Sequence, residues 1–137
     1  MKHYLFTYGM LTNRDIMDPG ARLIGAARAP GWKFEMLNFA NVHPGTAVST
    51  GGVLWEIDQD ILRSCDYREG FPHLYDRVLT SVYVGQQEYR AWVYTLTREG
   101  RADYSGYRAS DYYVESVEEG YRQHGVDLDQ LRESVGA

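Results

Sequence analysis

The chain has 137 residues, of which 44% are hydrophobic, so we expect one domain over residues 1–137 with a buried core. Its net charge of −5, without any basic run, argues against nucleic acid or an anionic membrane as a partner. No stretch is long and apolar enough to span a bilayer, and the N-terminus lacks a signal-peptide pattern. The single cysteine, Cys65, excludes an intramolecular disulfide and fits a reducing compartment, so we expect a cytoplasmic protein.

Hydrophobic periodicity, turn residues and caps predict a series of short elements. In chain order they are a buried strand at 3–8, a short helix at 14–17, two strands between 22 and 37 split at Pro30-Gly31, a loop at 38–52, a strand at 53–57, a helix from Asp58 onward, a hairpin of 75–84 with 88–96, a loop at 98–106, a helix from Ser110 to about His124, and one or two helical turns within 127–134. Several strands with few helices predict an α+β fold, either a small mixed β-barrel or a twisted sheet.

The helix after Asp58 places an acidic residue on its apolar side. Ile61, Leu62 and Cys65 form the inward stripe, and the next position on that face is Glu69, just before the helix-ending Gly70. An unpaired buried charge is costly, so such a carboxyl either finds a partner or has its pKa raised. The stretch alone leaves two alternatives, a helix-terminal ion pair or a working acid/base.

Other chemistries have weaker signals in the sequence. The histidines are far apart and form no HxH or HExxH pair, and no CxxC pair occurs, so no metal site is expected; they are His3, His43, His73 and His124. No Gly-rich phosphate loop and no Gly-x-Ser-x-Gly motif is present. Cys65 with His73 could form a thiol pair, but a thiol on an apolar stripe is usually inert packing. The turn at Gly9 could offer free N–H groups to an anion such as a carboxylate. Glu69 is the leading acid/base candidate.

Several short motifs follow one another in a characteristic order. They are Tyr8-Gly9-Met10-Leu11, Gly52-Val53-Leu54-Trp55-Glu56-Ile57, Asp66-Tyr67-Arg68-Glu69-Gly70, Tyr75-x-Arg77, Ala91-Trp92-Val93-Tyr94 and Tyr113 through Gly120-Tyr121-x-x-His124-Gly125. Together they resemble the γ-glutamylcyclotransferase-like (AIG2-like) family over nearly the whole chain. The resemblance implies a small mixed barrel with a pocket between the Tyr-Gly turn and a catalytic Glu.

The resemblance also implies a reaction. Family members cyclise a γ-glutamyl amine or amino acid to 5-oxoproline and release the amine, and they use no cofactor. The implied enzyme is an acyltransferase or amidine-type lyase that acts on a small molecule, with the family Glu corresponding to Glu69 as general acid/base. The alternative is a non-catalytic module that binds a γ-glutamyl or amino-acid-like ligand in the same pocket.

The remaining site residues follow from the same resemblance. Tyr8, Gly9, Met10 and Leu11 would bind substrate, with Tyr8 shaping the pocket and the backbone N–H groups of the other three binding a carboxylate or carbonyl oxygen. Tyr75 and Arg77 would contact the substrate region and orient Glu69, although Arg77 could instead form a structural ion pair. The family turn commonly reads Tyr-Gly-Ser/Thr-Leu or Tyr-Gly-Ser/Met-Asn, whereas this chain has Met10-Leu11, so the resemblance implies that a side-chain contact from Ser, Thr or Asn would be lost.

Overall fold

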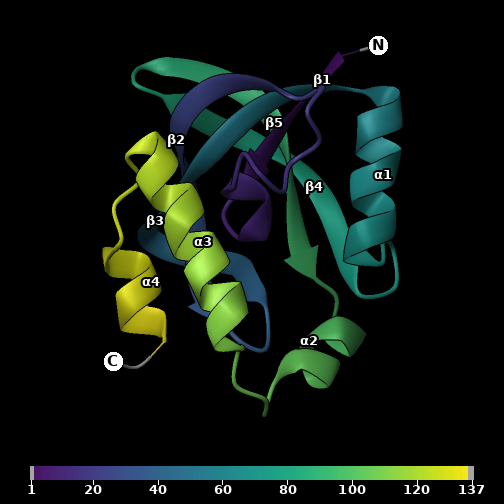
Figure 1. Ribbon diagram of the computed structural model, residues 1–137, viewed down its shortest axis with the longest axis vertical. Coiled ribbons are helices and arrows are strands. Elements are labelled where there is room, and N and C mark those ends of the chain that lie inside the picture. Colours follow the sequence, from purple (N-terminus) through teal and green to yellow (C-terminus); the bar gives the residue numbers. More distant parts are fainter. Residues whose placement is uncertain (1, 136–137) are drawn as a thin grey trace.

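The computed structural model describes residues 2–135. Within them the chain forms an α+β fold (Figure 1). One α-helix lies between the third and fourth strands in the sequence, and the other α-helices follow the last strand. The elements are β1 Lys2–Thr7, the 3-10 helix η1 Met10–Thr12, β2 Arg22–Met36, β3 Ala40–Asp58, α1 Gln59–Glu69, β4 Tyr75–Val84, β5 Gln87–Leu96, α2 Arg98–Tyr104, α3 Asp111–His124 and α4 Asp129–Ser134.

The strands close into a barrel in the order β1-β3-β2-β4-β5. Closure comes from a short parallel pairing of β1 with β5, in which Leu5 faces Trp92 and Phe6 faces Val93, while the other pairs are antiparallel. Side chains on both faces of the sheet are buried: Leu5, Phe6 and Trp55 are at most 1% exposed, and the Trp55 ring lies edge-on to His124 of α3. The predicted α+β barrel is therefore confirmed, and of its two forms the closed one is present.

The loop predicted at 38–52 is wrong, because β3 begins at Ala40 and continues through this segment. β3 pairs with β2 from Ala40↔Met36 onward, and the register shifts where residues 45–48 stand opposite the single residue Gly31. Pro30-Gly31 therefore displaces the register of one long strand instead of separating two strands. Close packing explains why β3 has a glycine at position 52, because a Cβ at Gly52 would lie 2.1 Å from the Thr7 carbonyl oxygen.

The two principal helices begin and end where their capping residues predict. The Asp58 carboxylate accepts a hydrogen bond from the Ile61 N–H at the start of α1, and Gly70 ends that helix in the left-handed conformation with φ 68°. The Ser110 hydroxyl caps α3 by accepting from the Tyr113 N–H. The hairpin of β4 and β5 and the final helix α4 are likewise confirmed.

Two short segments differ from the prediction. Residues 98–106 were expected to be a loop, but Thr97 caps the seven-residue helix α2 by accepting from the Gly100 N–H. Residues 14–17 were expected to be a helix, but they form a turn in which the Asn13 side-chain oxygen accepts from the Asp15 N–H. Asparagine side chains favour such local bonds over helix continuation.

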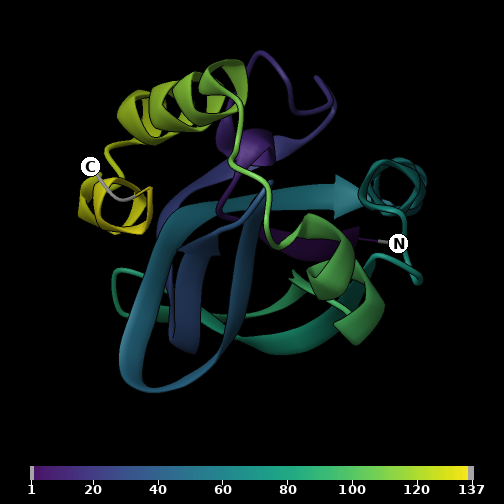
Figure 2. The same cartoon turned by 90° about the horizontal axis from the view of Figure 1, so that it is seen from below.

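The helices lie on opposite sides of the barrel. α3 and α4 lie side by side on one side, and α1 lies on the other (Figures 1 and 2). α3 packs so closely on η1 that a Cβ at Gly120 would lie 2.1 Å from the Thr12 hydroxyl oxygen. The Asn13 side-chain amide donates to the Ser116 carbonyl at 3.0 Å, and the Tyr121 hydroxyl donates to the Tyr8 carbonyl. The turn after β1 is therefore held between the barrel and α3.

None of the helices in residues 2–135 has both the length and the apolar character needed to cross a membrane.

Candidate active site

A cavity of about 170 Å³ opens between the turn after β1 and the C-terminal end of α1. Its lining is mainly aromatic and contains two charged residues, Arg68 and Glu69, which are adjacent in the sequence. The full lining is Phe6, Thr7, Tyr8, Gly9, Met10, Leu11, Phe39, Ala40, Arg68, Glu69, Tyr75, Tyr94, Tyr104 and Tyr113. An apolar pocket with a few polar groups directed into it is the usual form of a small-molecule site.

Glu69 is the last residue of α1, and its carboxyl faces this cavity. Burial raises the pKa of Glu69 from its ordinary value of 4.5 to about 7, and the nearby Arg68 guanidinium lowers it by a smaller amount. Within residues 2–135, the carboxyl forms neither a hydrogen bond nor an ion pair with another residue. The helix-terminal ion pair considered from the sequence is therefore not formed among these residues. A carboxyl with a pKa near 7 can both accept and donate a proton at neutral pH.

The turn opposite Glu69 presents backbone N–H groups. The Thr12 hydroxyl and N–H both donate to the Gly9 carbonyl, at 2.7 and 3.1 Å, and hold the turn in its 3-10 form. The first N–H groups of a helical turn have no partner within it. In residues 2–135, no hydrogen bond is formed by the N–H groups of Gly9 and Leu11, whereas the Met10 N–H approaches the Tyr113 hydroxyl and lowers the pKa of that tyrosine. The cavity wall therefore offers donors across from a carboxyl.

Tyrosine hydroxyls form much of the remaining wall and are bonded to the backbone. The Tyr8 hydroxyl donates to the Tyr94 carbonyl at 2.7 Å, and the Tyr75 hydroxyl donates to the Ala40 carbonyl at 2.6 Å. The Tyr113 hydroxyl accepts from the Ala40 N–H at 3.0 Å. Burial raises the pKa of Tyr8, Tyr75 and Tyr113 above the ordinary value, so these phenols stay neutral and do not compete with Glu69 as bases.

Arg77 lies outside the cavity lining, in contrast to its predicted contact with substrate. Its guanidinium forms two hydrogen bonds with the Asp66 carboxylate, at 2.8 and 3.1 Å, and packs on the ring of Trp92 at 4.2 Å. Asp66 also accepts a hydrogen bond from the cavity-lining Tyr94 hydroxyl at 2.7 Å. Because Asp66 lies one helical turn before Glu69, Arg77 is placed to fix the end of α1, not to touch a ligand.

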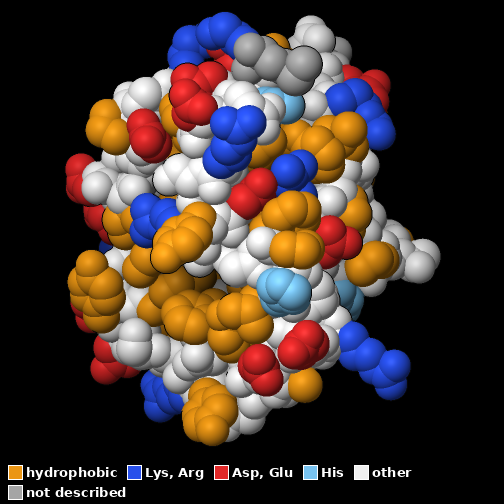
Figure 3. Space-filling view, turned by 90° about the vertical axis from the view of Figure 1, so that its right-hand side faces the viewer, with side chains coloured by type: hydrophobic (Ala, Val, Ile, Leu, Met, Phe, Trp, Pro, Cys, Tyr) orange, Lys and Arg blue, Asp and Glu red, His pale blue; other side chains and the backbone are white. Residues whose placement is uncertain are grey.

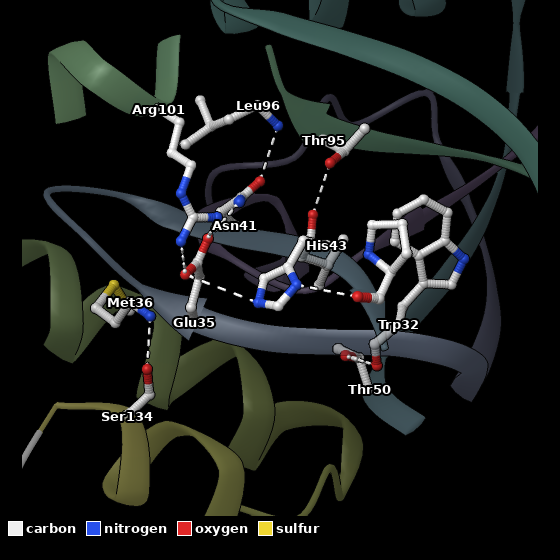
Figure 4. A network of polar contacts seen from close by, with 12 residues as sticks. Trp32, Glu35, Met36, Asn41, His43, Thr50, Thr95, Leu96, Arg101 and Ser134 are labelled. Atoms are coloured by element: carbon white, nitrogen blue, oxygen red, sulfur yellow. Dashed lines mark hydrogen bonds and ion pairs between the residues drawn. The ribbon is translucent and has the colours of Figure 1, made fainter. Parts of the chain in front are cut away.

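The wall formed by α2 is held by a second polar network (Figure 4). The Arg101 guanidinium donates to the Glu35 carboxylate at 2.7 and 3.0 Å, and the Asn41 side-chain amide donates to the same carboxylate at 2.6 Å (Figure 4). The Asn41 side-chain oxygen accepts from the Leu96 N–H, at the end of the strand that precedes α2. These bonds anchor α2 to β2 and β3, and α2 in turn places Tyr104 in the lining.

The thiol alternative receives no support from the geometry. Cys65 is 3% exposed on the buried face of α1, and burial raises the pKa of its thiol to about 12. His73 is exposed, and neither residue lines the cavity. Among the described residues, no group of three or more His, Cys, Asp or Glu side chains is arranged to hold a metal ion.

The sequence reasoning did not assign eight of the lining residues to the site, namely Phe6, Thr7, Phe39, Ala40, Arg68, Tyr94, Tyr104 and Tyr113. Tyr94 and Tyr113 were named only as members of the motifs that resemble the family, without a role in the site. Phe39 and Tyr104 lie in segments that were predicted to be loops. Arg68 was passed over although it directly precedes Glu69. Its charge next to an inward carboxyl was the one signal that could have singled it out.

Known structures share this fold. A γ-glutamyl cyclotransferase structure aligns with a TM-score of 0.84 at 18% identity, covering 99% of this chain and 88% of its own. An uncharacterised protein from Homo sapiens aligns with a TM-score of 0.83 at 19% identity over 98% and 87% of the two chains. An AIG2-like protein from Mus musculus aligns with a TM-score of 0.62 at 24% identity over 76% and 82%. The closed barrel is therefore the γ-glutamyl cyclotransferase-like fold.

The family follows from the sequence match. The family model described as gamma-glutamyl cyclotransferase, AIG2-like, matches residues 5–115, and the chain belongs to this family. Among curated proteins none matches the chain. Family and fold together define a cyclotransferase-type protein, and the match includes the turn after β1 and the end of α1.

Proposed function

We propose that this protein cyclises a γ-glutamyl amine or amino acid to 5-oxoproline and releases the amine, with Glu69 as general acid/base. The observation that supports it most is the cavity-facing carboxyl of Glu69, which has no partner among residues 2–135 and whose pKa burial raises to about 7. The reaction is an intramolecular acyl transfer in which no water is consumed. It requires a group that takes a proton from one nitrogen and returns it to another.

Proton transfer begins at the α-amine of the substrate. A free α-ammonium has a pKa near ~8 and is mostly protonated at neutral pH, so it needs a base before it can attack. Glu69, with a pKa of about 7, is well matched to take this proton. The freed amine forms a bond to the γ-carbonyl carbon and closes a five-membered ring. Glu69 then gives this proton to the leaving nitrogen, the original amide bond breaks, and the ring nitrogen passes its second proton to the released amine, which departs as an ammonium.

The cavity supplies the other half of the catalysis. An engineered protein cavity of about 150 Å³ holds a benzene molecule, so a space of about 170 Å³ suits a γ-glutamyl group folded for ring closure. Holding the two reacting atoms together replaces a bimolecular encounter with a far faster intramolecular one. The N–H groups of Gly9 and Leu11 would bind the substrate carboxylate or the oxygen on which negative charge develops.

The test is to incubate the protein with γ-glutamyl amines and amino acids and to measure 5-oxoproline by mass spectrometry. Glu69→Gln should lower kcat by about 10²–10⁴-fold, the usual contribution of one acid/base group. Glu115→Gln, an exposed change on α3, is the matched control and should keep activity. The kcat/KM of the wild type should fall as the pH drops below about 7, because the base becomes protonated.

Three outcomes would contradict the proposal. Activity that survives Glu69→Gln would exclude the mechanism. Loss of activity in a folded Cys65→Ala variant would return the thiol to consideration. Absence of turnover with every compound, combined with a ligand-induced rise in melting temperature, would indicate a binding module that uses the same cavity.

A further inference from the structure

The cavity carries one cation, Arg68, for which the proposed reaction has no use. Its side chain is exposed, yet it contributes to the lining beside Glu69. The guanidinium reaches toward the turn after η1, where Nη1 donates to the Ile16 carbonyl at 3.4 Å, which is longer than the usual ~2.7–3.2 Å of such a bond. Among residues 2–135 it forms no ion pair. Most of its donors are therefore available to a ligand at the edge of the cavity.

The size of the cavity decides which part of a substrate reaches this edge. A space of about 170 Å³ accommodates the cyclising γ-glutamyl group but not a second amino acid as well. The leaving group must therefore extend from the scissile bond toward the opening. Arg68 lines the cavity and is exposed, so it is the cation available to this outer region, whereas the N–H groups of the turn after β1 and Glu69 serve the reacting group.

The surrounding surface does not provide charge selection of its own. The face that carries α1 shows acidic and basic side chains interspersed with apolar ones, without a large patch of one sign (Figure 3). Discrimination by charge must then come from a residue next to the bound ligand. A guanidinium binds carboxylates through two parallel hydrogen bonds and repels ammonium groups.

We propose that Arg68 selects substrates by the charge of the leaving group, binding the carboxylate of γ-glutamyl amino acids and disfavouring γ-glutamyl amines. This inference rests on the proposed function, because it concerns the same site. Arg68 is thus a specificity-determining residue, distinct from the acid/base beside it. The alternative role, binding of the α-carboxylate of the γ-glutamyl group, would affect both kinds of substrate equally.

A matched substrate pair tests the proposal. γ-Glutamylalanine and γ-glutamylethylamide differ only in the carboxylate of the leaving group. The wild type should favour the alanine compound in kcat/KM by about tenfold, which corresponds to about 1.4 kcal/mol. Arg68→Gln should abolish this preference and Arg68→Glu should reverse it. The ratio within one variant is the quantity to compare, because any effect of the substitution on Glu69 acts on both substrates.

Controls separate this inference from the proposed reaction. Arg63→Gln, an exposed change on the same helix, should leave the ratio unchanged. Added salt should weaken the preference in the wild type but not in Arg68→Gln, because screening acts on the charge pair. Calorimetry with the Glu69→Gln variant measures the same preference as a ratio of Kd values without turnover.

The outcomes are distinct. A Kd preference that depends on Arg68, found without turnover, would support the inference while the proposed reaction fails. Equal loss for both compounds in Arg68→Gln would overturn the inference alone and assign Arg68 to the α-carboxylate. Absence of binding by either compound would overturn both proposals.

Discussion

Replacing Glu69 with Gln should stabilise the folded protein at alkaline pH while it removes the proposed acid/base. Burial raises the pKa of this carboxyl from 4.5 to about 7, so between these values the folded chain holds a proton that the unfolded chain has lost. Stability therefore falls as the pH rises through this window, and the loss is complete above about pH 7. At about 1.4 kcal/mol per pH unit, the charged carboxylate costs the fold about 3 kcal/mol.

The assay is urea unfolding of the wild type and Glu69→Gln at several pH values between about 5 and 8. The difference in free energy of unfolding should grow by about 2.5 kcal/mol in favour of the variant across this range, equivalent to about 8 °C in Tm for a chain of this size. The change of this free-energy difference with pH is the quantity to compare. The cost of burying the amide in the variant is the same at every pH, so it cancels from that change. Glu115→Gln should show no comparable growth, since Glu115 is exposed on α3.

A difference that stays constant with pH would refute this reasoning, because it would mean that Glu69 ionises as readily in the folded chain as in the unfolded one. Such a result would also remove the pKa match on which the proposed proton transfer depends. The expected result would identify Glu69 as a residue kept at the expense of stability, a pattern common at catalytic sites.

Two further substitutions test the parts that hold the site in place. Gly120→Ala should destabilise the fold by about 2–4 kcal/mol, measured by urea unfolding, because its Cβ would lie 2.1 Å from the Thr12 hydroxyl oxygen and force α3 away from η1; a neutral result would mean that α3 is loosely packed there. Arg77→Gln should cost about 2–3 kcal/mol through loss of the half-buried pair with Asp66, and in steady-state kinetics it should lower kcat more than it raises KM. A change in KM alone would instead point to direct contact with substrate.

Local signals in the sequence were sufficient for the features that depend on neighbouring residues. Asp58 and Gly70 bound α1 as predicted, and the spacing from Leu62 through Cys65 placed Glu69 on the inward face of that helix. Capping bonds and helical periodicity act within a few residues, so the sequence alone contains them. The resemblance to the family added the turn at Gly9 as the opposite wall of the site, and the cavity includes both.

Features that depend on distant partners were decided only by the tertiary structure. The Gly- and Pro-rich residues after Ala40 form a strand because β2 lies beside them and supplies hydrogen bonds, which outweighs their low strand propensity. The motif left two roles open for Arg77, contact with the substrate or a structural ion pair, and only the three-dimensional structure shows that it pairs with Asp66 and packs on Trp92 outside the cavity lining.

The sequence by itself determined that a carboxyl at Glu69 would face inward at the end of a helix. The tertiary structure decided what that carboxyl can do. Its pKa of about 7 arises because the carboxyl is buried at a cavity lined by tyrosines from β4, β5, α2 and α3, while none of residues 2–135 pairs with it. Burial of a charge is a sum over residues distant in the chain, which is why no local pattern of residues could supply it.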